Sequence, residues 1–164
     1  MRGPFPILLD LPSETATVAL ANSLAPGLHP GDTLLLSGPV GAGKTHFARA
    51  LIKARLRATG HDEDVPSPTY TLVQTYDDGI AEIWHADLYR LTGPAGALEL
   101  GLDSAFGTAI VLVEWPDRLG SLAPASALSL TFEAGDDETA RRVTLRSGDP
   151  RWADRLALTE AGNG

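Results

Sequence analysis

Apolar runs and segments of helical periodicity alternate along the 164-residue chain. Runs at residues 7–9, 33–36 and 109–113 predict short strands, and the unbroken apolar character of 109–113 is typical of a strand buried inside a sheet. Apolar residues at helical spacing predict two helices. One begins at the N-cap Ser13 and ends near residue 25, and the other opens after residue 43 and ends near residue 57.

Two further stretches carry the signals of β-hairpins. Residues 70–76 and 80–85 flank Asp77-Asp78-Gly79, a sequence that favours a tight turn between two strands. Near the C-terminus, alternating residues from 128 to 133 are followed by a turn and a second run at 142–146. The mixture predicts an α/β fold, with a sheet of the P-loop NTPase type flanked by helices and extended by antiparallel hairpins. Neither a repeat nor a linker divides residues 1–164, so we expect a single domain.

Composition narrows the class of protein. The 43% hydrophobic and 21% charged residues are typical of a soluble globular chain. No run approaches the roughly 18 apolar residues that span a membrane. The absence of cysteine excludes a disulfide framework and fits a cytoplasmic protein. A net charge of −8 disfavours direct binding to nucleic acid, which needs clustered cations, so any RNA involved is expected to be held by a partner.

The segment from Gly38 to Thr45 carries the most specific local motif. Its sequence GPVGAGKT matches G-x-x-x-x-G-K-[ST] at every fixed position and lies between a predicted strand and a predicted helix. Glycines let backbone N–H groups point toward phosphate oxygens, and the following helix N-terminus favours the negative charge. Lys44 can reach the β- and γ-phosphates, while the Thr45 hydroxyl can ligate Mg²⁺. We therefore expect this segment to bind a nucleotide.

The choice of nucleotide and the chemistry depend on other residues. The chain has only two asparagines, Asn22 and Asn163, and neither begins the N-K-x-D element that reads guanine. An adenine nucleotide, or weak base selectivity, is therefore favoured. Two acids follow apolar strands, and nucleotide hydrolysis needs acids near the metal and the attacking water. Glu114 follows five apolar residues and occupies the position of a Walker B acid, which favours a functional role. For Asp87, a functional role and an ordinary surface carboxylate at a strand end are equally compatible with the sequence.

Five segments in order resemble the TsaE family, small bacterial ATPases of tRNA threonylcarbamoyladenosine modification. They are GPVGAGKT (38–45), SPTYTL (67–72), HADLYRL (85–91), ELGLD (99–103) and EWPDRL (114–119). The resemblance extends roughly over residues 13–119. Many families share the first segment, but the order and spacing of the others are specific. Two positions depart from the family pattern: Ala86 replaces a usual aromatic residue, and His46 replaces a frequent small hydroxyl residue. Neither removes a group that the chemistry needs.

The resemblance implies an ATPase that uses ATP and Mg²⁺, with defined roles for several side chains. Thr45 and Glu114 would ligate or order Mg²⁺. Thr69, in a switch-like loop, would sense the γ-phosphate side. Asp87 would position or polarise the attacking water, although which acid acts as the base stays open. The residues that would hold the phosphates are Gly38, Gly41, Ala42, Gly43 and Lys44.

The resemblance also implies a partner. In the TsaE family, a TsaB–TsaD complex transfers the threonylcarbamoyl group to adenosine 37 of tRNA, and TsaE binds that complex. This chain would then meet tRNA only indirectly, with ATP turnover supporting repeated cycles. A loop such as residues 67–72, ordered by the γ-phosphate and relaxed after hydrolysis, can bias a partner interface between two states.

Several side chains near these motifs can be explained by a structural role alone. For Trp115, core packing is favoured over contact with the nucleotide, and for His85 a structural hydrogen bond is favoured over catalysis. Tyr89 and Arg90 fit a partner surface and a structural role equally. The basic residues of the second helix are interpreted as a solvated face rather than an RNA-binding patch; they are Arg49, Lys53, Arg55 and Arg57.

Two other functions are compatible with a phosphate loop. A small-molecule kinase would need an acceptor pocket and usually a cationic lid, and no arginine-rich insertion is evident, since only Arg118 lies between Arg90 and Arg141. A non-hydrolysing interaction module would use the nucleotide only to set its shape. Phosphate-transfer screens and single-turnover hydrolysis with the partners distinguish these alternatives from an ATPase.

Overall fold

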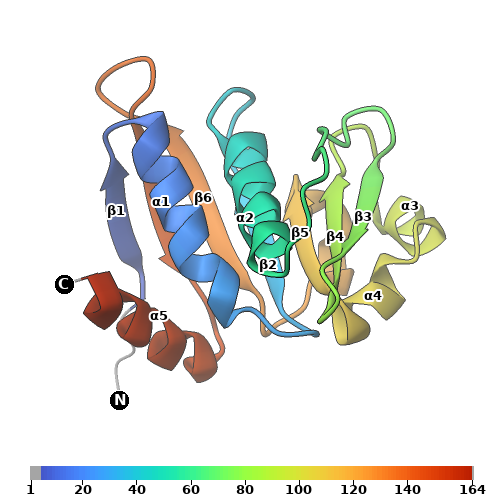
Figure 1. Ribbon diagram of the computed structural model, residues 1–164. Coiled ribbons are helices and arrows are strands. Elements are labelled where there is room, and N and C mark those ends of the chain that lie inside the picture. Colours follow the sequence, from blue (N-terminus) through green and yellow to red (C-terminus); the bar gives the residue numbers. More distant parts are fainter. Residues whose placement is uncertain (1–4, 164) are drawn as a thin grey trace.

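A single mixed sheet organises the protein (Figure 1). The computed structural model describes the backbone of residues 5–163 and the side chains of residues 5–156. Within this part of the chain, one seven-stranded sheet has the order β1-β7-β6-β2-β5-β4-β3. Its strands are β1 (Ile7–Leu11), β2 (Thr33–Ser37), β3 (Val73–Asp77), β4 (Glu82–Asp87), β5 (Ile110–Glu114), β6 (Leu128–Ala134) and β7 (Arg141–Arg146).

Helices lie between several of these strands, and one follows the last strand. They are α1 (Glu14–Leu24), α2 (Lys44–Ala58), α3 (Pro94–Glu99), α4 (Leu102–Thr108) and α5 (Pro150–Asn163), with the 3₁₀ helices η1 (Ala25–Gly27) and η2 (Pro116–Leu122). The hydroxyl oxygen of Ser13 accepts a hydrogen bond from the N–H of Ala16 at 3.2 Å, which confirms the predicted N-cap of α1. No helix within residues 5–163 combines the length and the apolar character needed to cross a membrane.

The parallel strands define the functional edge of the sheet. β2 pairs in parallel with β5 on one side and β6 on the other, and β4 continues the parallel set beyond β5. The carboxyl ends of these four strands therefore open at one edge, where α/β proteins bind their ligands. β1, β3 and β7 pair antiparallel with their neighbours. The predicted α/β sheet with antiparallel additions is confirmed.

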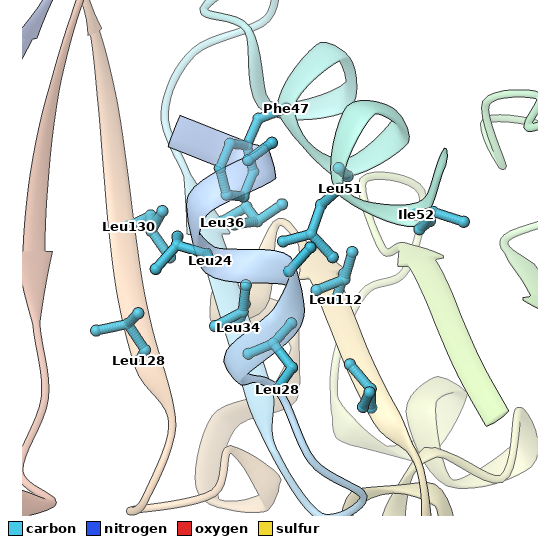
Figure 2. Packing of buried hydrophobic residues seen from close by; sticks show 14 of the residues in the cluster. Leu24, Leu28, Leu34, Leu36, Phe47, Leu51, Ile52, Leu112, Leu128 and Leu130 are labelled. Atoms are coloured by element: carbon cyan, nitrogen blue, oxygen red, sulfur yellow. The ribbon is translucent and has the colours of Figure 1, made fainter. Parts of the chain in front are cut away.

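Hydrophobic side chains cover both faces of the sheet. Along β2, Leu34 and Leu36 pack into the cluster shared with α1 and α2, which lie side by side on that face (Figures 1 and 2). The intervening Leu35 belongs to the opposite cluster, with residues of α3, α4 and η2. This alternation follows from the two-residue repeat of a strand. Each fully buried leucine contributes about 1.5–3 kcal/mol, so β2 is a rigid support for the loop that follows it.

The predicted hairpins form with different limits. β3 begins at Val73, three residues later than the predicted start at 70, because Leu72 adopts φ 69° and its N–H bonds to the carbonyl of Pro68 at 2.8 Å. β4 begins at Glu82 rather than at residue 80, since Asp78 holds the turn by accepting the N–H groups of Ile80 and Ala81. The C-terminal hairpin pairs β6 with β7.

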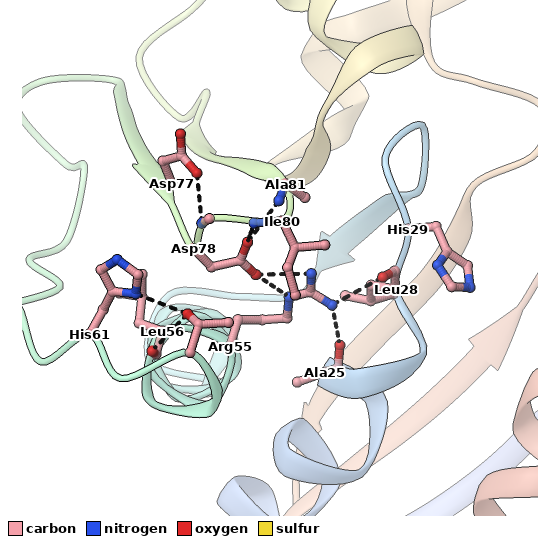
Figure 3. Close-up of polar contacts among 12 residues, drawn as sticks. Ala25, Leu28, His29, Arg55, Leu56, His61, Asp77, Asp78, Ile80 and Ala81 are labelled. Atoms are coloured by element: carbon pink, nitrogen blue, oxygen red, sulfur yellow. Dashed lines mark hydrogen bonds and ion pairs between the residues drawn. The ribbon is translucent and has the colours of Figure 1, made fainter.

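The prediction of a solvated basic face on α2 is wrong for Arg55. Its side chain is only 8% exposed, and Nη2 lies 2.9 Å from Oδ2 of the buried Asp78 (Figure 3). Nη1 donates to the carbonyl oxygens of Ala25 and Leu28 at 2.9 and 3.0 Å. A guanidinium with this many donors satisfies several acceptors at once. Arg55 thus joins α2 to the β3–β4 turn and to the η1 segment.

Candidate nucleotide-binding site

The glycine loop covers the carboxyl end of β2. Gly38 has φ 136°, and a Cβ at this position would lie 2.4 Å from the carbonyl oxygen of Phe132 on β6. Only glycine fits such a close approach of two backbones. The loop then turns through a hydrogen bond from the Ala42 N–H to the carbonyl of Pro39 at 3.1 Å, and Gly43, with φ 100°, caps α2. The segment 38–45 therefore has the strand–loop–helix setting that the motif requires.

Lys44 lies at the first turn of α2 and is 4% exposed. Its Nζ donates to the carbonyl of Gly38 at 2.5 Å and lies 3.6 Å from the centroid of the Trp115 ring. Burial lowers the pKa of Lys44, while the carboxylates of Glu114, Asp87 and Asp117 oppose this effect. Trp115 both packs against the core and lines the pocket beside Lys44, so the interpretation of Trp115 as packing alone is incomplete.

A chain of three side chains crosses the floor of the site. The hydroxyl of Thr45 donates to Oε1 of Glu114 at 2.6 Å. Oε2 of Glu114 lies 2.7 Å from Nε2 of His85, whose ring is fully buried on the neighbouring strand. Both oxygens of a nearly buried carboxylate are thereby held in fixed directions. The hydrogen bond predicted for His85 is present, and its partner is the site carboxylate of Glu114; whether the role of His85 is structural stays a prediction.

Asp87 ends β4 directly beside Glu114, its partner in the parallel ladder. Its side chain lines the pocket and is 8% exposed, and Oδ1 accepts the N–H of Tyr89 at 3.1 Å. In the described part of the chain, no hydrogen bond engages Oδ2. Two acids on adjacent strands therefore face the same pocket, one with an oxygen free to bind a further group.

The predicted switch loop lies at the mouth of the pocket. Thr69 is exposed, lines the pocket and shares a hydrogen bond of 2.7 Å with the hydroxyl of Ser67. The carbonyl of Tyr70 accepts from Nη2 of Arg90 at 2.7 Å, and that of Leu72 accepts from the N–H of Asp87 at 2.8 Å. The loop is thus tied through its backbone to the strand end that carries Asp87.

One pocket of about 620 Å³ joins these groups. Of the residues predicted from the sequence, Gly38 and Ala42 lie outside its wall: Gly38 packs against β6 and Ala42 is buried. The predicted residues that line the wall are Gly41, Gly43, Lys44, Thr45, Thr69, Asp87 and Glu114. The structure therefore brings most of the predicted site residues into one cavity, and their chemical roles stay predictions.

Sequence reasoning missed Arg141 at the start of β7. Its Nη2 donates to the carbonyl of Gly41 at 3.0 Å, and its side chain lies against the phosphate loop beside Gly43. Thr139 of the preceding turn, with Glu14 and Thr17 of α1, completes this end of the pocket. The topology of the predicted C-terminal hairpin could have indicated that Arg141 lies near the phosphate loop. A hairpin that follows a strand parallel to β2 must turn at the same edge as the phosphate loop.

The possible metal donors are oxygen atoms. Among the described residues, no three His, Asp or Glu side chains cluster closely enough to hold a metal ion by themselves. Thr45 and Glu114 supply a hydroxyl and a carboxylate in contact with each other. This is the type of donor that Mg²⁺ takes from proteins, usually one or two groups together with phosphate oxygens and water. The donor set therefore fits Mg²⁺ held jointly by protein and nucleotide.

A parallel core with a glycine loop between its central strand and the next helix defines the P-loop class of α/β proteins. Comparison with known proteins gives the family. The family model described as "Threonylcarbamoyl adenosine biosynthesis protein TsaE" matches residues 11–143, and the chain belongs to the TsaE family. The resemblance stated from the sequence motifs is confirmed.

Individual proteins similar to this chain support the same family assignment. The tRNA threonylcarbamoyladenosine biosynthesis protein TsaE of Rickettsia felis is 38% identical over 130 residues, which cover 79% of this chain and 74% of that protein. Its namesake in Bacillus subtilis is 36% identical over 143 residues, covering 86% and 84%. The crystal structure of Bacillus subtilis YdiB superposes with a TM-score of 0.79 at 26% identity, covering 96% of each chain.

Proposed function

We propose that this protein binds ATP with Mg²⁺ and hydrolyses it as an accessory component of tRNA threonylcarbamoyladenosine modification. The observation that carries the proposal is the contact between Thr45 and Glu114 at 2.6 Å, beside Lys44 at the end of the glycine loop. The names of the relatives, which assign those proteins to tRNA threonylcarbamoyladenosine biosynthesis, support the biological setting.

The loop and Lys44 bind the phosphates. Backbone N–H groups of the glycine loop and the N-terminus of α2 would form a cradle for anions, with two exceptions: Pro39 has no N–H, and the N–H of Ala42 already bonds to the carbonyl of Pro39. The ammonium of Lys44, now satisfied by the carbonyl of Gly38, turns to phosphate oxygens when they are present. Burial lowers the pKa of Lys44, and a nearby polyanion would raise this pKa again because it stabilises the charged form of the buried amine. Each charge-assisted hydrogen bond contributes about 1.5–3 kcal/mol.

Thr45 and Glu114 hold the metal side of the site. Bound ATP with Mg²⁺ supplies the phosphoanhydride and the electrophilic phosphorus on which hydrolysis depends. Glu114 keeps its orientation because His85 fixes Oε2, which leaves Oε1 directed at Thr45. Ordering of this kind by a second layer of hydrogen bonds is what maintains a metal ligand.

Asp87 orients the water that attacks. It lies next to Glu114, and its Oδ2 is available to accept a hydrogen bond from water because Tyr89 engages only Oδ1. Hydrolysis also needs water to be positioned in line with the scissile bond. The link between the carbonyl of Leu72 and the N–H of Asp87 makes this position depend on the loop that carries Thr69.

The partner in this proposal is a TsaB–TsaD complex, which holds tRNA, while this chain acts without direct RNA contact in the cytoplasm. The net charge of −8 agrees with an indirect role. Tyr70, 87% exposed at the tip of the loop beside the pocket, offers an aromatic contact whose position changes with the loop. Aromatic residues are enriched where proteins bind one another.

The test is ATP turnover by the chain alone and with TsaB–TsaD, in the wild type, Lys44→Ala and Lys53→Ala. These are the only two lysines, and Lys53 lies farther along α2, away from the phosphate loop. We expect turnover that the partners stimulate, that Lys44→Ala abolishes and that Lys53→Ala retains. Turnover indifferent to the partners would contradict the accessory role, and phosphate transfer to a small molecule would favour a kinase.

A further inference from the structure

The pocket has two chemically different ends. Glu114 and Asp87 lie on β5 and β4, on one side of the central strand β2. Thr139 and Arg141 lie on the other side, where β6 turns into β7, and the first turns of α1 complete that wall. Glu114, Asp87 and the proposed metal donors thus occupy one end, and Arg141 is the cationic side chain of the other, which Glu14 also lines.

The edge of the Arg141 guanidinium is largely committed to the main chain. Nη1 donates to the carbonyl oxygens of Glu138 and Ala140 at 2.8 and 2.7 Å. Nη2 donates to the carbonyl of Gly41 at 3.0 Å, and Nε is buried without an acceptor in the described part of the protein. What such a group can still offer to a ligand is chiefly its flat face, together with its charge.

That charge forms no close ion pair with a carboxylate among the described residues, whereas Arg142, the next residue along β7, pairs with Asp10 at 3.1 Å. The electrostatic effect of Arg141 on Asp137 of the preceding turn is the smallest of the causes that lower the pKa of that carboxyl. An arginine paired with main-chain carbonyls alone keeps its full positive charge. The planar cation therefore lies beside the phosphate loop with nothing of opposite sign bound to it.

The preceding turn fixes Arg141 before any ligand arrives. Oδ1 of Asp137 accepts the N–H groups of Thr139 and Ala140 at 2.9 and 2.8 Å, and these bonds lower the pKa of Asp137. The N–H of Gly135 closes the turn on the carbonyl of Ala140 at 2.9 Å. Because side chain and turn are both held in place, little ordering is needed when a planar ligand binds.

We propose that the face of the Arg141 guanidinium is the platform on which the base of the bound nucleotide stacks. This rests on the proposed binding of a nucleotide in the pocket, with its terminal phosphates directed to the acidic end. The nucleoside then extends across the glycine loop toward α1 and β7. Guanidinium planes stack on bases, and stacking accepts any base because each has a π-face. The platform thus explains how a chain without N-K-x-D holds a base.

The experiment separates base from phosphate. Dissociation constants for ADP and for inorganic tripolyphosphate are measured by calorimetry on the full chain, in the wild type, Arg141→Lys and Arg142→Lys. Lysine keeps the positive charge but lacks the planar guanidinium group on which a base can stack. We expect Arg141→Lys to weaken ADP binding about tenfold or more, to leave tripolyphosphate binding within about twofold, and Arg142→Lys to change neither. Thermal unfolding of each variant checks that the fold is intact.

Other outcomes would contradict the proposal that the base stacks on Arg141. Equal weakening of both ligands would assign Arg141 to the phosphates or to support of the glycine loop, and unchanged ADP binding would remove it from recognition altogether. A strong preference for ADP over GDP in the wild type would require a selective contact instead of stacking. If the wild type bound neither ligand, the proposed nucleotide function itself would fail, which is distinguishable from a defect confined to Arg141→Lys.

Discussion

The buried imidazole of His85 lies 2.7 Å from Oε2 of Glu114, on the strand next to its own. Its other ring nitrogen, Nδ1, has no hydrogen-bond partner among the described residues. The ring is therefore held by packing and by one carboxylate. Since the second oxygen of that carboxylate bonds to Thr45, His85 would position the proposed metal ligands if Mg²⁺ binds there.

His85→Phe should raise the Mg²⁺ concentration needed for half-maximal ATP turnover by roughly 10–100-fold, because it releases Glu114 from its fixed orientation. His85→Gln places an amide N–H near the position of Nε2 and should recover most of the loss. The measurement is turnover against Mg²⁺ concentration. An unchanged Mg²⁺ requirement in His85→Phe would show that the imidazole serves only the core.

Asp87→Asn should separate binding from chemistry. The amide keeps the size of the side chain but accepts the proton of a water poorly, so turnover should fall about 10²-fold or more. The dissociation constant for ATP should stay within about threefold, since Lys44 and the loop bind the phosphates. Asp103→Asn, which removes an exposed carboxylate of α4 that does not line the pocket, is the control. A parallel loss of binding and turnover would contradict the assignment of Asp87 to the water.

Thr69→Ala should make binding to TsaB–TsaD insensitive to the choice between ATP and ADP, because the loop loses the hydroxyl that would sense the terminal phosphate. Thr71→Ala is a matched control two residues away, where the hydroxyl accepts from Nε2 of Gln74 at 2.8 Å. Partner affinity is measured by calorimetry with each nucleotide. Retained nucleotide sensitivity in Thr69→Ala would rule out this loop as the switch.

Asp78→Ala should destabilise the fold by about 3–5 kcal/mol, because it leaves the buried Arg55 without its carboxylate. Asp77→Ala, which removes only one exposed cap to the N–H of Gly79, should cost about 0.5–1.5 kcal/mol. Chemical denaturation of the two variants gives both values. A similar small cost for both would mean that Figure 3 shows a contact of little energetic value.

The same pair predicts a pH dependence. Burial raises the pKa of Asp78, but the N–H groups of Ala81 and Ile80 and the Arg55 guanidinium outweigh burial and lower it. A carboxyl with a lowered native pKa stabilises the fold fully above its unfolded value of about 3.9. That contribution is lost as the pH falls below this value through the native pKa. The acid side of the stability profile should therefore be flatter in Asp78→Ala than in the wild type.

Nucleotide binding should change the emission of Trp115. The Lys44 ammonium lies 3.6 Å from its ring centroid and should move to the phosphates, which removes a charge from the indole face. Titration with ADP should give a saturable change that Trp115→Phe abolishes and Trp84→Phe retains. A signal that survives in Trp115→Phe would place the responsive tryptophan elsewhere.

Features that depend on neighbouring residues in the chain could be predicted from the sequence, and features that depend on distant residues could not. The contiguous motif 38–45 and the strand-end acid Glu114 were predictable because their chemistry follows from neighbours in the chain. Arg141 was not, since its contact with Gly41 spans 100 positions and depends on the hairpin after β6. Arg55 was misassigned because a single sequence does not reveal that a turn 23 residues later buries its charge.

Some predicted limits of strands and helices were wrong for the same reason. The alternation from residue 70 indicated a strand, but the bond from the Leu72 N–H to Pro68 competes with sheet pairing and prevails. Helix α5 (Pro150–Asn163) has no counterpart among the predicted elements. Its packing beside α1 depends on contacts such as that of Trp152 Nε1 with the carbonyl of Ser126 at 2.7 Å, which the periodicity of the sequence does not encode.

Gly38 bears on how such a protein can change over generations. Its missing side chain makes room for the Phe132 carbonyl of the adjacent strand, at 2.4 Å from where a Cβ would stand. The constraint comes from the sheet, and no ligand takes part in it. A descendant that bound no nucleotide would still need this glycine for the sheet to pack, whereas nothing in the sheet would require Lys44. Loss of the lysine, and not of the first glycine, would therefore indicate that the proposed nucleotide binding had been lost.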